Sequence, residues 1–273
     1  MMDAPDIFET VAALRAKGEH FAVATVVRTI SLTAAKAGAK ATILADGTIS
    51  SGWIGGGCAR AAVIRAAKQS MADGKPRLIS VAPADLLKDL GVEPGQAQNG
   101  VEFARNSCPS QGTMDIFVEP MVPKPELLIC GASPVALALA ELGKRLGFDI
   151  LASAAVEDLD KFATLAKGTL PGFVLTELKP AERYIVVATQ GRGDEAALLA
   201  ALAAPSHFVA FVGSRKKAAA LNATLSKRGA TADSLAALHA PAGLDIGAVT
   251  PEEIALSILG QIISARRHGH RSA

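Results

Sequence analysis

Two patterns of apolar positions divide the chain near residue 119. In the first part, Gly112–Val118 alternates apolar with polar residues and Phe21–Arg28 is rich in β-branched residues, as strands are. In the second part, short apolar runs such as Leu127–Cys130 and Arg183–Thr189 are separated by helical stretches. Strands that alternate with helices predict a parallel, doubly wound sheet. We therefore expect an α/β protein with a small α+β domain followed by a doubly wound domain.

The first part is predicted to contain a hairpin and a long helix. Asp46 and Gly47 form a hairpin turn signal between the predicted strands 39–45 and 48–53. The remaining elements expected here are helices at 7–17 and from the glycine-rich stretch to about residue 73, and strands at 77–81 and 112–118.

The second part is predicted to alternate four strands with helices and to end in a capped helix. Thr250, Pro251 and Glu253 suit a helix start, because threonine can cap it, proline fits the first turn and glutamate completes a capping box. The strands are expected at 127–130, 148–152, 183–189 and 207–212, and the helices before the last one at 135–146, 158–166, 194–203 and 216–228.

A proline-rich stretch separates the two parts. Three prolines fall within residues 119–126, a spacing that stiffens the backbone and interrupts regular structure. We therefore predict an N-terminal domain at 1–119, a linker at 120–126 and a C-terminal domain at 127–273.

Composition and charge narrow the class of protein. The chain has 273 residues, a formal net charge of +2 and three cysteines. This charge and the lack of a strong basic block argue against a nucleic-acid partner, and an odd number of unpaired cysteines fits the reducing cytoplasm. The N-terminus has no signal-peptide pattern, and no uncharged run approaches the roughly 20 residues of a membrane span. We expect a soluble, cytoplasmic protein.

The most informative stretch is Gly52–Arg60, where three consecutive glycines precede Cys58 and a predicted helix. Glycine allows close backbone approach to a ligand, and the free N–H groups and dipole of a helix start bind anions and favour a thiolate. The alternative is a small buried cysteine after a tight turn. Cys108 lies in a polar, glycine-containing segment and is a second candidate, whereas Cys130, inside an apolar strand, is interpreted as structural.

Three loops of the second part follow strand ends and should form one crevice, as in Rossmann-like domains. They are residues 131–134, 190–194 and 213–217, and the last combines glycine, serine and three cations at a helix start, which suits phosphate. Ordinary NAD(P) binding is not favoured. Ser133 and Pro134 replace the bare backbone that a pyrophosphate needs, and no acidic residue ends the strand at 148–152.

Together these motifs resemble the XdhC/CoxI family of molybdenum hydroxylase accessory proteins. The resemblance rests on the segments 55–58, 108–112, 119–120, 131–133, 213–217, 243–248 and 250–255. Three departures are Arg60 in place of an acid, Ile30–Thr33 in place of a Gly-Ser-x-Pro turn, and the missing acid of the second domain. They indicate a divergent branch, nearer to the accessory proteins of carbon monoxide dehydrogenase.

The resemblance implies a maturation chaperone, not an enzyme. Such a protein binds the molybdenum cofactor (molybdopterin), protects it during sulfuration and delivers it to a xanthine dehydrogenase or carbon monoxide dehydrogenase apoenzyme. The implied partners are that apoenzyme, a cysteine desulfurase and a second copy of the chain, as a homodimer. Cys58 is the candidate metal ligand, although it could also relay sulfur or only pack. The candidate cofactor-binding residues are Gly55, Gly56, Gly57, Cys58, Cys108, Gly131, Ser133, Gly213, Ser214 and Arg215.

Two alternatives remain open at this stage. An NAD(P)-dependent oxidoreductase would use the doubly wound domain in the common way, and tight binding of NAD or NADP would support it. A non-catalytic adaptor would dock the apoenzyme through its last helix and bind no small molecule. The glycine-cysteine stretch counts against the adaptor, because a scaffold has little need of such a costly backbone.

Overall fold

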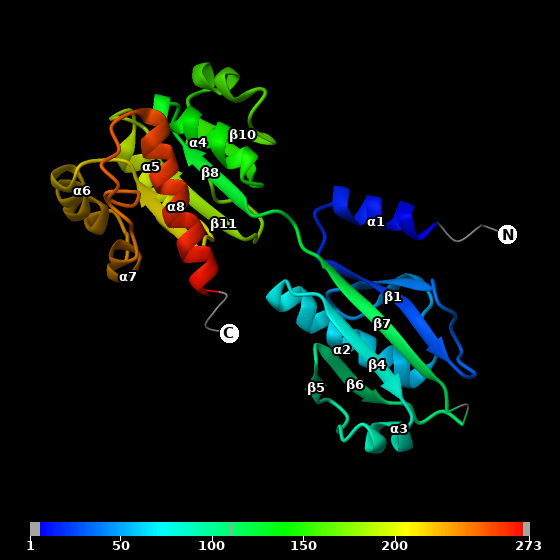
Figure 1. Ribbon diagram of the computed structural model, residues 1–273. Coiled ribbons are helices and arrows are strands. Elements are labelled where there is room, and N and C mark those ends of the chain that lie inside the picture. Colours follow the sequence, from blue (N-terminus) through cyan, green and yellow to red (C-terminus); the bar gives the residue numbers. More distant parts are fainter. Residues whose placement is uncertain (1–5, 110, 270–273) are drawn as a thin grey trace. The chain divides into compact units, whose positions relative to one another are not determined.

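The computed structural model of the chain describes residues 6–109 and 111–269. These residues form two compact units, unit 1 (residues 1–123) and unit 2 (residues 124–273) (Figure 1). The boundary falls in the proline-rich stretch. Strand β7 includes Pro120 and Met121, and β8 starts at Glu126, so residues 122–125 connect the two units.

Unit 1 is built on a seven-stranded sheet with the order β3-β2-β1-β7-β4-β6-β5. All neighbouring strands are antiparallel except β4 and β6. Helix α2 packs on one face, where its alanines and Val63 meet the alternate apolar positions of β1 and β7. The elements are α1 (Ile7–Ala16), β1 (Phe21–Ile30), β2 (Lys40–Leu44), β3 (Ile49–Gly52), α2 (Gly57–Asp73), β4 (Arg77–Ala82), α3 (Ala84–Asp89), β5 (Ala97–Gln98), β6 (Val101–Arg105) and β7 (Thr113–Met121).

Unit 2 is a doubly wound domain, as the sequence predicted. Its five strands are all parallel, in the order β10-β9-β8-β11-β12. Helices α4 and α8 cover one face and α5 and α6 the other (Figure 1). The elements are β8 (Glu126–Cys130), α4 (Pro134–Arg145), β9 (Asp149–Ala154), the 3-10 helix η1 (Val156–Phe162), β10 (Gly168–Pro171), β11 (Arg183–Val187), α5 (Asp194–Ala203), β12 (Phe208–Phe211), α6 (Arg215–Lys227), α7 (Ala232–Ala236) and α8 (Pro251–Gly269).

The structure differs from the sequence prediction in a few short elements. The helix predicted at 158–166 is the 3-10 helix η1, which begins and ends earlier. Helices α3 and α7 and strands β5, β6 and β10 have no counterpart in the prediction, and none is longer than six residues. The hairpin at Asp46 and Gly47 forms, because the Asp46 carboxylate accepts hydrogen bonds from the backbone and side chain of Thr48.

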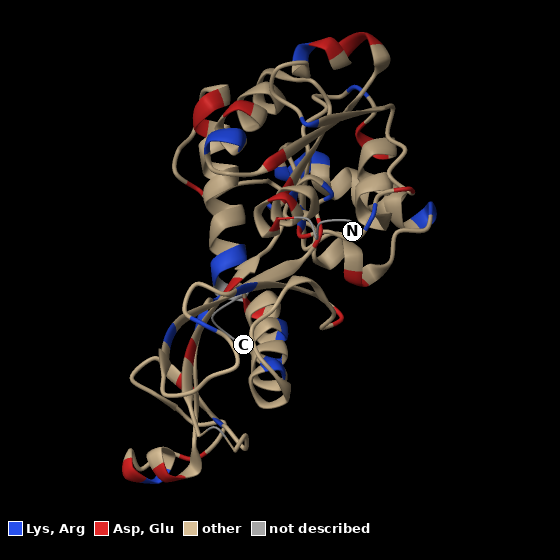
Figure 2. Cartoon of the chain, turned by 90° about the vertical axis from the view of Figure 1, so that its right-hand side faces the viewer, with Lys and Arg blue, Asp and Glu red and all other residues tan. Residues whose placement is uncertain are grey.

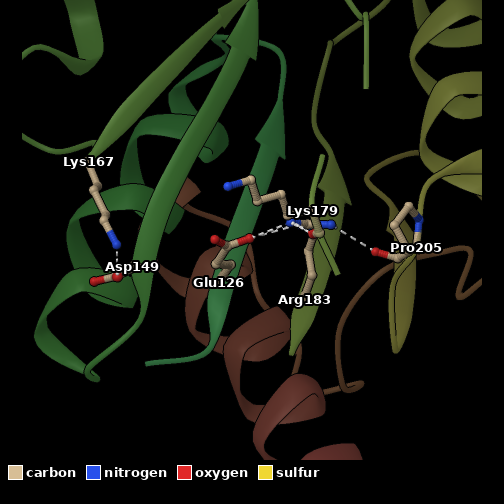
Figure 3. A network of polar contacts seen from close by, with 6 residues as sticks. All are labelled: Glu126, Asp149, Lys167, Lys179, Arg183 and Pro205. Carbon is tan, nitrogen blue, oxygen red and sulfur yellow. Dashed lines mark hydrogen bonds and ion pairs between the residues drawn. The ribbon is translucent and has the colours of Figure 1, made fainter. Parts of the chain in front are cut away.

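One buried arginine joins the strands of unit 2 at the amino ends of β8 and β11. Arg183, at the start of β11, is 1% exposed. Its guanidinium donates to Glu126 on β8 at 2.7 and 2.9 Å, and to the carbonyl oxygens of Lys179 and Pro205 (Figure 3). Because every bond partner is an acceptor, the buried charge is compensated.

Charges of both signs are interspersed along both units (Figure 2). Among the described helices, none combines the length with the apolar character needed to cross a bilayer.

Candidate functional site

Cys58 is the second residue of helix α2, as expected from the glycine-cysteine stretch. Gly56 is the N-cap residue, and no side chain of the described residues caps the helix. The first N–H groups of the helix are therefore left for water or a ligand. Cys58 is half-buried.

The segment that carries Cys108 lies against Cys58. We call residues 106–112 the thiol loop; of these, Ser110 is outside the described residues. The Ser107 N–H donates a hydrogen bond to Cys58 Sγ at 3.4 Å, and Cys108 is the next residue. The structure thus brings the segment that carries Cys108 against Cys58, although the two are far apart in sequence.

Asn106 holds the thiol loop in shape. It is buried, and its Nδ2 donates to the Gly112 carbonyl at 2.6 Å while its Oδ1 accepts from the Cys108 N–H at 3.0 Å. Gly112 is required by packing, because a Cβ there would lie 2.2 Å from the Leu32 carbonyl oxygen. Sequence reasoning noted this segment for its cysteine but missed Asn106, whose burial only the fold reveals.

The three glycines before Cys58 are not equivalent. Gly55 is buried and has a φ of +111°, a conformation that side chains rarely adopt. Gly56 has an ordinary φ of −84°, and a Cβ on Gly56 or Gly57 would meet no heavy atom within 4 Å. The fold therefore explains Gly55 but not its two neighbours, which stand exposed at the helix start.

Unit 2 has a crevice of about 380 Å³ at the carboxyl ends of its strands. We call this cavity the crevice; it lies where the strand order reverses, between β8 and β11, the place where such sheets bind ligands. Its walls include the turn after β8, the end of β9 and the loop after β11. The lining residues are Gly131, Ala132, Ser133, Pro134, Ala154, Ala155, Asp158, Lys161, Gly172, Phe173, Thr189, Gln190 and Arg192.

Three residues of the turn after β8 have structural roles. Gly131 has a φ of +110°, and a Cβ there would lie 2.6 Å from the Ala188 carbonyl oxygen, so glycine is needed for β8 and β11 to approach. Ser133 caps α4 by accepting the Ala136 N–H at 3.2 Å. Pro134 is the first residue of the helix and has no N–H to offer.

Three charged side chains stand at the crevice. The Asp158 carboxylate, on η1, forms ion pairs with Lys161 Nζ at 2.7 Å and with Arg192 Nη1 at 3.0 Å. The Asp158 side chain is only 11% exposed, whereas Lys161 and Arg192 are 47% and 65% exposed. The hydrogen bond from Lys161 lowers the pKa of Asp158, and the charge of Arg192 adds to this effect against the opposing influence of burial. The sequence analysis found no acidic residue at the end of this strand, because the 3-10 helix η1 that brings Asp158 to the crevice is not visible in the pattern.

The predicted anion loop at Gly213, Ser214 and Arg215 is not part of the crevice lining. Ser214 caps α6 by accepting the Lys217 N–H at 3.2 Å, and the Lys217 ammonium pairs with Asp194. Burial alone would raise the pKa of Asp194, but hydrogen bonds from Lys217, Thr189 and the Gly191 N–H outweigh it and the pKa is lowered. The Lys217 cation of this loop is thus already neutralised within unit 2.

Cys130 differs from the other two cysteines. It lies in β8 with no exposed surface, and burial raises the pKa of its thiol to about 12. A protonated, enclosed thiol is a packing group, in agreement with its structural interpretation.

The fold and the two sites define a two-unit protein with a Rossmann-like second unit, and the comparisons with known proteins agree. Residues 127–262 match the family model of the XdhC Rossmann domain, and residues 14–82 match that of the XdhC and CoxI family. The chain belongs to the XdhC and CoxI family, which confirms the resemblance drawn from its motifs.

Two curated relatives and one solved structure are similar to the chain. It is 30% identical over 275 residues to the uncharacterised protein YqeB of Escherichia coli (strain K12), an alignment that covers 96% of this chain and 47% of YqeB. It is 26% identical over 166 residues to a probable xanthine dehydrogenase subunit of Bacillus subtilis (strain 168), covering 57% of this chain and 47% of that protein. The chain thus spans about half the length of the curated relatives it matches.

A crystal structure described as a xanthine dehydrogenase of Bacillus halodurans aligns with 95% of this chain and 95% of its own. The sequence identity is 18% and the TM-score is 0.46.

Proposed function

We propose that this chain is an accessory protein in the maturation of a molybdenum hydroxylase. In this proposal it binds the molybdenum cofactor, shields it while its terminal sulfur is installed, and delivers it to a xanthine dehydrogenase or carbon monoxide dehydrogenase apoenzyme. Family membership and the naming of one relative as part of a probable xanthine dehydrogenase support an accessory role. A cysteine desulfurase and a second copy of the chain are the further partners proposed.

The observation that carries the proposal is the contact between Cys58 and the thiol loop. A half-buried cysteine stands at a helix start that has no side-chain cap among the described residues, with the Ser107 N–H on its sulfur and Cys108 next along the loop. Thiolate sulfur is a soft ligand suited to molybdenum or to sulfur transfer, and free helix N–H groups suit a phosphate or another anion. The residues present therefore fit the cofactor's chemistry.

The roles of the chain's own residues follow from these contacts. Cys58 would bind the metal or accept sulfur, and the Ser107 N–H would stabilise negative charge on its sulfur. Gly56 and Gly57, for which the fold gives no reason, would let the bound group approach the backbone closely. The cofactor would supply the metal and sulfur that the target enzyme uses.

The proposal is tested by purifying the full chain without oxygen from cells that make the cofactor, and measuring pterin and molybdenum per chain. We expect near-stoichiometric amounts of both in the wild type. Cys58→Ala should lose most of the bound metal, and Cys108→Ala should reduce it. Ser107→Ala is the matched control: it keeps the N–H on Cys58 Sγ and should retain the cofactor.

Two outcomes would count against the proposal. A chain that carries no cofactor and does not bind added molybdopterin is not a carrier, and the adaptor alternative would then be favoured. Wild-type metal content and target activation in Cys58→Ala would remove Cys58 from the site.

A further inference from the structure

We propose that the crevice of unit 2 binds a nucleoside phosphate, with the phosphate held by Arg192 and Lys161 and not by the glycine turn. This inference concerns unit 2 alone and does not rest on the proposed function. It follows from the position and size of the crevice, from the donors that the turn lacks and from the charges that stand opposite.

The position and size of the crevice suit a small ligand. It opens at the reversal of strand order in a parallel sheet, where doubly wound domains bind nucleotides. Its volume of about 380 Å³ lies near the lower end of the roughly 300–1,000 Å³ of small-molecule sites. A single nucleotide therefore fits this space better than an extended dinucleotide.

The glycine turn offers little to a phosphate. Two of the N–H positions at the start of α4 are closed to a ligand, because Pro134 has no N–H and the Ala136 N–H donates to the Ser133 side chain. A helix start with two of its donors removed is a weaker anion site, so side chains have to supply much of the positive charge in the crevice.

Arg192 and Lys161 supply that charge from two different loops. Arg192 follows β11 and Lys161 belongs to η1 after β9, and both point to the mostly buried carboxylate of Asp158. The contact of Arg192 with Glu157, at 3.8 Å between two exposed groups, is weak. One carboxylate therefore holds two exposed cations together, and a phosphate can bridge them through charge-assisted hydrogen bonds.

The opposite wall leaves room for a sugar and a base. Ala154 and Ala155, at the end of β9, have the smallest side chains that are not glycine, and Phe173 adds an apolar ring to the lining. Each Asp158 oxygen has a second lone pair beyond its ion pair, so it can accept a hydroxyl of a ribose. In this fold the carboxylate near the second strand is the group that commonly does so.

The test is isothermal titration of the purified full chain, produced without the molybdenum cofactor. The probes are the cytidine and adenosine 5′-monophosphates and 5′-diphosphates, the unphosphorylated nucleosides, inorganic phosphate and NAD. We expect at least one nucleotide to bind with a dissociation constant below about 1 mM, and its nucleoside to bind at least about tenfold more weakly. Arg192→Gln and Lys161→Gln should each weaken the nucleotide at least about tenfold, and more salt should weaken it further.

Arg145→Gln is the matched control. Arg145 is an exposed arginine of α4 with its own carboxylate partner, Glu141, and neither residue lines the crevice. This variant should bind nucleotide as the wild type does, and circular dichroism should show all variants folded. The inference is overturned if no nucleotide binds, if Arg192→Gln and Lys161→Gln bind unchanged, or if phosphate alone binds as well as the nucleotide.

A final experiment distinguishes this inference from the proposed function, because molybdopterin also carries a phosphate. It measures both nucleotide binding and cofactor content in the same variants. If the Arg192→Gln variant loses nucleotide binding but still co-purifies with pterin and molybdenum, the nucleotide has a site of its own. If Arg192→Gln loses both ligands and the cofactor displaces the nucleotide, the phosphate belongs to the cofactor and the nucleoside assignment is wrong. Loss of cofactor in Cys58→Ala with unchanged nucleotide binding would support both proposals.

Discussion

The two units each contain a glycine turn between a strand and a helix, and the two turns differ in what they leave unsatisfied. In unit 2, Gly131 is needed because neighbouring backbone fills the place of a side chain, and Ser133 caps the helix that follows. In unit 1, Gly56 and Gly57 have open space around them, and the described residues offer no cap to α2. Packing thus explains the glycine of the turn in unit 2, but it does not explain Gly56 and Gly57 in unit 1.

This difference shows how a glycine that packing requires can be distinguished from a glycine that belongs to a binding site. Gly131 is required because a side chain there would clash with a neighbouring carbonyl, so its presence is not evidence that the turn binds a ligand. A glycine that no neighbouring atom requires, next to a cysteine at a helix start without a side-chain cap, is a candidate for contact with another molecule, and the proposed function uses Gly56 and Gly57 in this way. The two units also differ in their arginines. Arg183 of unit 2 is buried and hydrogen-bonded to acceptors on all sides, whereas Arg65 of unit 1 is half-exposed and lies 3.7 Å from Glu102.

The largest effect is expected from Arg183→Met in unit 2. It leaves the Glu126 carboxylate and two carbonyl groups without their donor, and breaking a buried pair in this way costs about 3–5 kcal/mol. The matched change in unit 1 is Arg65→Met, whose side chain is 52% exposed and stands 3.7 Å from Glu102, so it should cost no more than about 1 kcal/mol. Denaturant unfolding followed by circular dichroism measures both, and equal losses would contradict the contrast.

The next effect is expected from Gly131→Ala. The new Cβ would strain a φ of +110° and press on the backbone of residues 188 and 189, at an expected cost of about 2–4 kcal/mol in the free energy of unfolding. The only tryptophan, Trp53, belongs to unit 1, so its fluorescence reports that unit separately. Circular dichroism should show an early loss of structure that the Trp53 signal does not follow. A variant as stable as the wild type would mean that the turn is not under this constraint.

A smaller effect is expected from pH acting on Asp194. The pKa of this carboxyl is lowered in the folded state, so it contributes stability above the ordinary aspartate pKa of about 3.9, and that contribution is lost as the pH falls below it. Asp194→Asn should cost about 1–2 kcal/mol at neutral pH, because Lys217 and Thr189 lose a charged acceptor. The stability of this variant should also fall less steeply between about pH 5 and pH 3. A parallel fall in both proteins would exclude Asp194 as a source of the acid sensitivity.

The smallest effect on stability is expected from Gly56→Ala and Gly57→Ala. Neither side chain would meet a neighbour. Alanine is the better helix former at Gly57, inside α2, but is less favourable than glycine at the N-cap position of Gly56, so the free energy of unfolding should stay within about 1 kcal/mol of the wild type in both variants. The amount of cofactor that co-purifies should nevertheless fall, because the added methyl group stands where the bound group approaches the backbone. Cofactor content at the wild-type level in both variants would show that these glycines have no part in the site.

Much of the fold could be predicted from periodicity, whereas the site depended on contacts that periodicity does not encode. The long strands and helices of both units followed from apolar spacing, and the boundary of α5 matched the prediction residue for residue. The two-residue strand β5 and the short β6 and β10 were missed, because so few residues carry no clear pattern and pairing with neighbours decides them.

For the site, local motifs located Cys58 and the turn at Gly131 but not their partners. The hydrogen bond from Ser107 to Cys58 joins segments 49 residues apart, and no single-sequence pattern predicts such an encounter. The phosphate expectation at Ser214 and Arg215 relied on residue types alone. In the structure, the serine and Lys217 of that loop are occupied by partners of their own.

The position of β8 also has a consequence for how the chain is made. β8 is the first strand of unit 2 to leave the ribosome, yet it lies in the middle of the sheet between β9 and β11. β9 follows soon after, but β11 begins only at Arg183, so one edge of an almost wholly apolar strand has no partner while the residues between are translated. A truncated chain that ends before Arg183 lacks β11 and leaves that edge of β8 open to pairing with strands of other molecules, so it should aggregate more readily than the full chain.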